Sequence, residues 1–177
     1  MNIGKFEYFE RSNGGLMPRQ DNEDKTHFDS MTFGLIKPDA FERKLIGEVI
    51  YQVEQHLAIR VMRMSLPGAD FWHKFYQEHQ GRAYYDTLVQ FMSSGPIIAM
   101  VLTINTPNAE WQAGEPSPAV RVWRGLMGAS SPRKRLAGTI RHRLALDQPE
   151  HRNLVHGSDS DTAVEREVIL AERYGIL

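Results

Sequence analysis

The sequence predicts an α/β (α+β) fold, a ferredoxin-like sandwich in which helices pack on a four-stranded antiparallel sheet. Two observations lead to this class. Apolar runs of strand length alternate with segments whose apolar residues recur at helical spacing, in the order β-α-β-(αα)-β-α-β-α. Right-handed crossovers between strands in that order favour the ferredoxin-like arrangement.

The first half of this pattern opens with a short strand over residues 32–36, an apolar run that stops at Lys37-Pro38. Apolar residues spaced three and four apart then predict an amphipathic helix over residues 46–57. Residues 58–66 form the next predicted strand, which ends at Pro67-Gly68, a strong turn signal.

The second half of the pattern contains the remaining elements. Two short helices, the most apolar strand, a proline-rich loop, a helix and a last strand are predicted over residues 70–80, 83–93, 97–104, 105–118, 119–127 and 139–146. The C-terminal helix is predicted to begin at a capping box formed by Thr162 and Glu165 and to run to Gly175. One face of this helix is apolar, which indicates packing on the sheet.

Residues 1–30 differ from the rest of the chain. Asn13-Gly14-Gly15, Pro18 and the polar run over residues 21–24 interrupt any periodicity and leave few apolar side chains to bury. We therefore expect a flexible N-terminal extension over residues 1–30 and a single domain over residues 31–177.

The composition limits the classes of function. The 177 residues include 21 basic and 22 acidic side chains, so the formal net charge is −1 and gives no reason to expect a nucleic-acid partner. The absence of cysteine excludes disulfides and thiol catalysis. No stretch approaches the roughly 20 apolar residues of a membrane span, and the N-terminus lacks the apolar core of a signal peptide. We expect a cytoplasmic protein with no membrane partner.

The octet over residues 153–160, Asn-Leu-Val-His-Gly-Ser-Asp-Ser, is the first candidate for chemistry. It places the imidazole of His156 beside a permissive glycine and two short hydrogen-bonding side chains. The chain has seven histidines, and any one alone is more often a surface or core residue than a nucleophile, so the octet leaves both interpretations open. The pairs His73/His79 and His151/His156 lack the ligand spacing of a closed metal site.

A run of cations is the second candidate. The stretch holds no acidic residue between Glu115 and Asp147, and its basic residues are Arg121, Arg124, Arg133, Lys134, Arg135, Arg141 and Arg143. A solvated basic face with scattered ion pairs is one interpretation. Arginine forks match phosphate oxygens, and the hydroxyls of Ser130 and Thr139 lie in the same stretch, so we favour an anion site. Lys37, at a predicted strand end, could add a point charge.

These pieces occur together in one family, the nucleoside diphosphate kinases. The segments that resemble its motifs, in the same order, are residues 33–40 (Phe-Gly-Leu-Ile-Lys-Pro-Asp-Ala), 75–89, 92–101, 138–141 (Gly-Thr-Ile-Arg) and 152–160. The resemblance covers nearly all of residues 31–170. It implies a catalytic domain that moves the γ-phosphoryl group from a nucleoside triphosphate to a nucleoside diphosphate, in ping-pong order, through a phosphohistidine.

The resemblance also implies roles for individual side chains. His156 would accept the phosphoryl group, Glu167 would hydrogen-bond its other ring nitrogen, and Ser158 would hydrogen-bond to Glu167. The residues expected around the phosphates are Lys37, Tyr76, Arg124, Ser130 and Arg141. Lys37 and Asn153 would also reach the ribose, and Tyr84 would stack on the base. Mg²⁺ is the implied cofactor, held by the phosphates of the nucleotide, so no protein metal ligands are expected.

Four features depart from the family pattern. His142-Arg143 stands where the family has Gly-Asp, and Ala137 replaces a proline. Residues 103–117 and 145–151 are longer than the usual connections. These departures lie around subunit contacts and the base, while every position implied in phosphoryl transfer persists, so we expect activity.

The resemblance further implies a homo-oligomer built on a dimer. The elements expected to form the dimer, the helix over residues 46–57 and the strand over residues 58–66, keep their apolar pattern. A higher-order contact is expected to be weaker than is common in the family, because the successive cations Arg133, Lys134 and Arg135 would repel across a symmetric interface.

Two other interpretations remain open from the sequence. A nucleotide-binding or regulatory member could keep the fold and transfer phosphate poorly, or to protein side chains. The basic stretch over residues 121–143 could instead be a nucleic-acid face, which would make oligonucleotide binding steeply salt-dependent. The preferred nucleotide and the role of residues 1–30 do not follow from the sequence.

Overall fold

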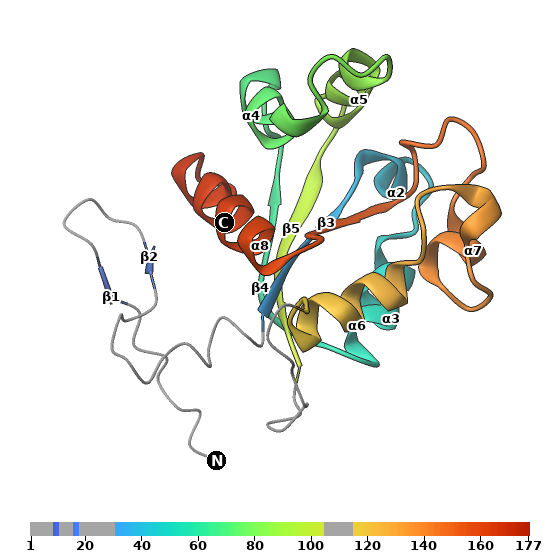
Figure 1. Cartoon of the computed structure of the whole chain (residues 1–177), viewed down its shortest axis with the longest axis horizontal. Coiled ribbons are helices and arrows are strands. Elements are labelled where there is room, and N and C mark those ends of the chain that lie inside the picture. Colours follow the sequence, from blue (N-terminus) through green and yellow to red (C-terminus); the bar gives the residue numbers. More distant parts are fainter. Residues whose placement is uncertain (1–8, 11–15, 18–30, 105–114) are drawn as a thin grey trace.

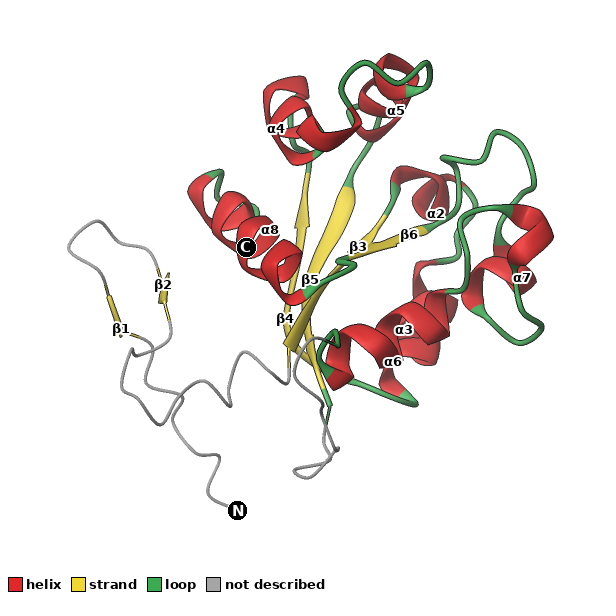
Figure 2. Ribbon diagram, viewed as in Figure 1, coloured by secondary structure: helices red, strands yellow, loops and turns green. Residues whose placement is uncertain are grey.

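A computed structural model describes residues 9–10, 16–17, 31–104 and 115–177 of the chain. Its centre is a four-stranded antiparallel sheet in the order β4-β5-β3-β6 (Figure 1, Figure 2). The strands are β3 (Met31–Ile36), β4 (Ala58–Ser65), β5 (Ile97–Thr103) and β6 (Val155–Gly157). This order and the antiparallel pairing of every neighbour confirm the predicted ferredoxin-like sandwich.

The central strand β3 pairs with a strand on each side. It pairs along its whole length with β5, from Met31 opposite Thr103 to Ile36 opposite Ile98. On its other side it pairs with the short strand β6. The strand is almost an unbroken apolar run because helices cover both faces of the sheet and leave no solvent side.

The two faces of the sheet carry different helices (Figure 2). One face is covered by α3 (Ile46–Glu54), α6 (Pro118–Met127) and α7 (Ile140–Leu144), and the other by α4 (Ala69–Phe75), α5 (Tyr85–Met92) and α8 (Asp161–Arg173). Shorter pieces are α2 (Pro38–Glu42) and the 3₁₀ turns η1 (Gln77–His79) and η2 (Pro132–Lys134). Side chains alternate between the faces, so Phe33 and Leu35 enter the α4–α5–α8 core while Ile36 enters the other.

The prediction of a strand over residues 139–146 is wrong, because this segment contains helix α7. The hydroxyl of Thr139 accepts a hydrogen bond from the His142 N–H at 3.3 Å, which caps the first turn of the helix. The fourth strand is β6, only three residues long, and it contains His156. A strand of that length is too short to produce a period-two signal in the sequence.

The predicted capping box at Thr162 and Glu165 is also wrong. The N-cap of helix α8 is Ser160, two residues before Thr162, and the Ser160 hydroxyl accepts a hydrogen bond from the Ala163 N–H at 3.2 Å. The remaining predicted helices and strands are confirmed, with ends that differ by a few residues.

The expected flexible extension over residues 1–30 lies mostly outside the described residues. Within it the structure describes Phe9–Glu10 and Leu16–Met17, which pair antiparallel as β1 and β2. Most of the predicted loop over residues 105–118 also lies outside the described residues, and its described end leads into α6.

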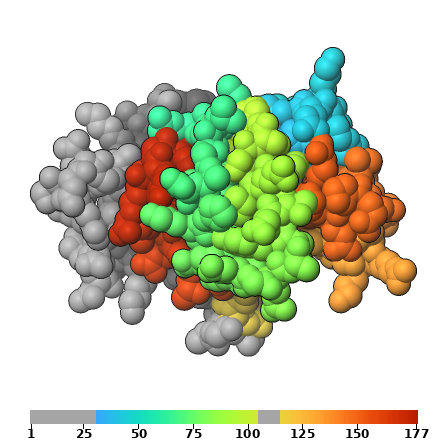
Figure 3. All heavy atoms as spheres, turned by 90° about the horizontal axis from the view of Figure 1, so that it is seen from above, coloured from blue at the N-terminus to red at the C-terminus, as the bar shows by residue number. Residues whose placement is uncertain are grey.

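One face of the molecule brings distant segments together, as the view from above shows (Figure 3). Helix α8 lies beside α4, where Phe71 contacts Tyr174 with ring centroids 5.4 Å apart. Helix α5 lies beside the segment that leads to β6, where Phe91 contacts His151 at 5.2 Å. The residues in front of β6 therefore share a surface with the α4–α5 hairpin.

Candidate active site

The backbone that carries His156 is held in an uncommon conformation. His156 lies opposite Leu35 in the middle of β6, and the chain enters β6 through Leu154, whose φ of 70° is left-handed. The Leu154 N–H donates to Asp39 Oδ2 at 3.1 Å, and its carbonyl accepts from the Lys37 N–H at 2.8 Å. Such a conformation costs on the order of 1–3 kcal/mol and persists only where its surroundings enforce it. Asp39 supplies that restraint, a role that the sequence did not reveal.

The imidazole of His156 is oriented by a carboxylate from helix α8. Nε2 lies 3.1 Å from Glu167 Oε2, and the Ser158 hydroxyl donates to the same oxygen at 2.7 Å. Arg166 contacts the other Glu167 oxygen at 3.6 Å. In neutral histidine one nitrogen bears the proton, so a proton on Nε2 directed at Glu167 leaves the lone pair on Nδ1. The ring is set up to use Nδ1 as a nucleophile.

Two aromatic rings from α4 and its C-terminal end enclose one side of the imidazole. Phe75 and Tyr76 meet it edge-on, with centroids 5.0 and 6.1 Å away. Burial, and next the charge of Glu167, raise the pKa of the Tyr76 hydroxyl far above its usual value. That hydroxyl has no hydrogen-bond partner among the described residues. It is therefore a neutral donor beside the ring.

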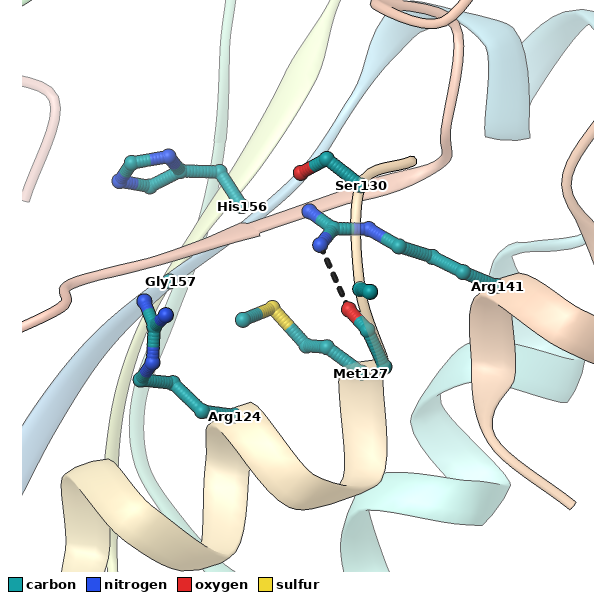
Figure 4. Close-up of a pocket in the computed structure, with 8 residues that line it drawn as sticks. Arg124, Met127, Ser130, Arg141, His156 and Gly157 are labelled. Atoms are coloured by element: carbon teal, nitrogen blue, oxygen red, sulfur yellow. Dashed lines mark hydrogen bonds between the residues drawn. The ribbon is translucent and has the colours of Figure 1, made fainter. Parts of the chain in front are cut away.

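A cavity of about 220 Å³ opens next to His156, and several residues of the predicted anion site line it (Figure 4). Figure 4 shows Arg124 extending from α6 and Arg141 from α7 toward this space, with Ser130 on the chain that follows α6, near the end of the Arg141 side chain. The residues that line the cavity are Arg124, Met127, Gly128, Ala129, Ser130, Arg141, His156 and Gly157. Two guanidinium groups and a hydroxyl thus line a cavity that His156 also borders.

The Arg141 guanidinium makes structural hydrogen bonds and keeps one N–H group without a partner in the described part of the chain. It donates to the carbonyls of Gly128 and Val155, both at 2.7 Å, so it ties the end of α6 to β6. A guanidinium has five N–H donors, and Arg141 Nε has no partner among the described residues. Burial first, and then the nearby cations Arg135 and Arg124, lower the pKa of Arg141 to about 10. A buried cation beside other cations is stabilised by an anion.

Lys37 and Asn153 form a buried pair beside the same site. The Lys37 ammonium donates to Asn153 Oδ1 at 2.8 Å and to the His151 carbonyl at 3.2 Å. Burial, and after it the charge of Arg141, lower the pKa of Lys37 to about 7, although Asp39 acts in the opposite direction. Burial also raises the pKa of Asp39, against the effect of Lys37. The lysine is therefore close to losing its charge at neutral pH.

Tyr84 lies apart from these groups, at the N-terminus of α5. Its residue surface is 48% exposed, the largest exposure of any tyrosine proposed for the site. Its hydroxyl is 2.9 Å from His79 Nδ1 on η1. The hydrogen bond fixes one edge of the ring, and the ring itself remains open to solvent. This is the arrangement of a flat stacking surface.

The seven cations predicted as an anion site have different surroundings, and only two of them lie at the cavity. Arg124 and Arg141 line the cavity. Arg121 pairs with Glu115 at 2.6 Å and Arg143 with Glu48 at 3.3 Å, so these two follow the interpretation of scattered ion pairs. The Thr139 hydroxyl caps α7 and donates to the Leu136 carbonyl, and it is not part of the cavity lining. Fewer cations therefore line the cavity than the sequence indicated.

Arg135 differs from the other cations because its side chain is only 3% exposed. It donates to the carbonyls of Ser130 and Leu146, at 3.2 and 3.1 Å, and pairs with Asp147 at 3.1 Å. It therefore braces the loop that carries Ser130. The expected repulsion across a higher-order interface consequently rests on Arg133 and Lys134, whose residues are exposed.

Comparisons with known proteins give the family of the chain. The family model for nucleoside diphosphate kinases matches residues 30–171. The chain belongs to the nucleoside diphosphate kinase family. Among similar nucleoside diphosphate kinases, that of Metallosphaera sedula is 39% identical over 140 residues, 78% of this chain and 90% of that protein. That of Glaesserella parasuis is 42% identical over 138 residues, 77% of this chain and 90% of that protein.

A solved member of the family has the same fold. The crystal structure of nucleoside diphosphate kinase from Encephalitozoon cuniculi, in a cubic apo form, superposes with a TM-score of 0.68 at 28% identity. The match covers 80% of this chain and 87% of that one. Within the described part of this chain, no cluster of three or more His, Asp or Glu side chains could hold a metal. No helix there is long and apolar enough to cross a membrane.

Proposed function

We propose that the protein is a nucleoside diphosphate kinase whose domain, residues 31–177, transfers the γ-phosphoryl group through a phosphohistidine at His156. One observation carries the proposal. Nε2 of His156 is held 3.1 Å from the Glu167 carboxylate, so Nδ1 is left for a cavity lined by Arg124, Ser130 and Arg141. An oriented neutral imidazole beside paired guanidinium groups suits attack on a phosphate.

The first half-reaction follows from this geometry. The Nδ1 lone pair attacks the γ-phosphorus in line, and an N–P bond forms. The bond from the γ-phosphorus to the oxygen that bridges to the β-phosphate breaks, and its electrons leave on that oxygen with the nucleoside diphosphate. The ring keeps its Nε2 proton and gains a positive charge, which Glu167 stabilises. A second nucleoside diphosphate attacks the phosphohistidine and reverses these steps.

The cations of the cavity act on the transferring group. Phosphoryl transfer passes through a loose transition state with charge on the equatorial oxygens, so catalysis depends on positioning and electrostatic stabilisation. Arg124, Ser130 and Arg141 surround that position, and each well-placed donor contributes about 2.7–4 kcal/mol to lowering such a barrier. Arg141 is fixed before the substrate arrives, since its guanidinium donates to two backbone carbonyls.

Mg²⁺ would arrive bound to the phosphates of the nucleotide. The cavity lining contains arginines and a hydroxyl and no carboxylate, so it fits a phosphate chain that carries its own cation. The bound ion would neutralise phosphate charge during transfer. Lys37 and Asn153, hydrogen-bonded to each other, would contact the ribose, Lys37 and Tyr76 would complete the phosphate site, and Tyr84 would stack on the base.

We also propose a homodimer built on α3 and β4. β4 is an edge strand that carries Met62 and Met64, and Leu66 follows directly after it; each of the three is between 50% and 70% exposed. Exposed apolar edges invite pairing, and a two-fold contact closes them. Light scattering at micromolar concentration should give a dimer or a multiple of it, and Met64→Glu should shift it toward the monomer. A monomeric parent protein would contradict the dimer. The cytoplasmic location is proposed from the sequence alone.

The activity is tested by labelling with [γ-³²P]ATP and Mg²⁺. We expect an acid-labile label on the protein that leaves as labelled nucleoside triphosphate when any nucleoside diphosphate is added. The His156→Ala variant should keep the fold and take up no label. Label on His151 or Ser158 would refute the assignment, and label that stays on the protein after the chase would favour a regulatory role.

A further inference from the structure

The proposed mechanism leaves one fully buried polar side chain next to the nucleophile unexplained. Trp123, on α6, has no exposed surface, and its indole Nε1 donates to the backbone carbonyl of His156 at 3.1 Å. The next residue along α6 is Arg124, which lines the cavity. One side chain therefore joins the helix that carries a cavity arginine to the strand that carries the nucleophile.

The sheet is built to accept this indole. Gly34 of β3 and Gly157 of β6 are direct cross-strand partners, so the sheet has no side chain at two adjacent positions. A Cβ added at Gly34 would lie 3.1–3.3 Å from three atoms of the indole. A Cβ added at Gly157 would overlap the indole and approach the Met127 methyl to 2.7 Å. The two glycines form a flat seat that no other residue type leaves open.

The seat and the hydrogen bond act on the same atoms. The indole lies on the glycine pair from the α6 side, while the imidazole of His156 contacts Phe75 and Tyr76 from the α4 side. The His156 backbone is thus held between a packing contact and a donor on one side and aromatic rings on the other. A shift of the indole would move the strand relative to both Arg124 and Glu167. Misplacement by about 1 Å can cost about 100-fold in rate.

We infer that Trp123 is a positioning residue for the transfer reaction: through the Gly34–Gly157 seat and the bond to the His156 carbonyl, it sets the distance between the nucleophile and Arg124. The inference rests on the proposed function. It concerns the rate of phosphoryl transfer and not the affinity for nucleotide, because Trp123 is buried behind the cavity.

The test compares two tryptophans of the same kind. Trp72 is also fully buried, and its indole also donates to a backbone carbonyl, that of Pro67 at 3.2 Å. Trp123→Phe and Trp72→Phe each remove one such bond and keep an aromatic ring. We expect both to lower the melting temperature, and we expect Trp123→Phe alone to slow phosphoenzyme formation, by about two- to tenfold at unchanged nucleotide affinity.

Quench-flow labelling with [γ-³²P]ATP measures the rate constant, and nucleotide titration measures the affinity. Gly34→Ala keeps the indole N–H and forces the ring to move by a few tenths of an ångström, so it should slow labelling too, and it serves if Trp123→Phe does not fold. An unchanged rate in Trp123→Phe or Gly34→Ala, or an equal loss in Trp72→Phe, would overturn the inference. Failure of the wild-type protein to form phosphoenzyme would instead overturn the proposed function.

Discussion

The phosphate end and the base end of the proposed site are built in different ways. At the phosphate end, His156, Glu167 and Arg141 each make hydrogen bonds of 2.7–3.1 Å to neighbours, and the carboxylate and the guanidinium are nearly buried. At the base end, Tyr84 is about half exposed and has a single hydrogen bond, to His79. Bond-making groups need fixed geometry, whereas a stacking surface accepts any flat base. This difference predicts a site that is strict in its chemistry and accepts different bases.

The largest expected effect falls on a cavity arginine. Arg124→Ala removes a donor aimed at the transferring phosphoryl group and should lower kcat by about 100- to 1,000-fold. Arg124→Lys keeps the charge and loses the fork, so it should recover part of the loss. Steady-state kinetics with ATP and a nucleoside diphosphate measure both. A loss confined to KM would place Arg124 with the tolerant end of the site.

The next effect concerns the carboxylate behind the nucleophile. Glu167→Gln keeps the size of the side chain but cannot stabilise the charge that develops on the imidazole. By analogy with carboxylates that orient metal-bound histidines, phosphorylation should slow by about 10- to 100-fold. Single-turnover labelling gives the rate, and nucleotide titration should show little change in affinity. An unaltered rate would reduce Glu167 to a structural acceptor for Ser158.

A substitution at the base end should change the affinity for nucleotides. Tyr84→Ala removes the exposed ring and should raise KM for all nucleotides by about 5- to 150-fold, the range for one stacked base. Tyr84→Phe keeps the ring and loses the bond to His79, so it is the matched control and should stay close to the parent. If Tyr84→Ala lowered kcat and spared KM, the division between the two ends would be wrong.

The smallest expected effect is the uptake of a proton when nucleotide binds. Burial lowers the pKa of free Lys37 to about 7, so at pH 8 the side chain is mostly neutral. A bound phosphate chain favours the ammonium form and raises this pKa. Binding at pH 8 should therefore take up nearly one proton, and affinity should fall by up to about tenfold per pH unit above pH 7. Calorimetry in buffers of different ionisation enthalpy measures the uptake. Lys37→Gln should show none, and uptake that persists in this variant would exclude Lys37 as its source.

The sequence predicted the phosphate end better than the parts that support it. His156, Lys37 and Arg141 lie in contiguous motifs, so their type and order could be recognised without coordinates. Residues 139–146 were mistaken for a strand because a five-residue helix capped by a threonine leaves almost no periodic signal. Arg135 was grouped with surface cations, since nothing in a basic run indicates which side chain turns inward.

The supporting contacts depend on register, which the sequence does not contain. Gly34 and Gly157 are more than a hundred positions apart, and only the pairing of β3 with β6 makes them a seat for Trp123. Asp39 restrains Leu154 through the same pairing. Local motifs predict which groups react, and tertiary pairing determines what holds them.

In the proposed mechanism phosphorylated His156 lies on the reaction path. Rapid-quench labelling of the parent protein at saturating ATP and Mg²⁺, followed by mapping of the label, measures whether it does. The label should appear on His156 with a rate constant at least as large as kcat for nucleotide exchange, and the transfer to added nucleoside diphosphate should be equally fast. A phosphohistidine that forms more slowly than kcat would be a side product, and direct transfer between nucleotides would replace the mechanism proposed for this fold.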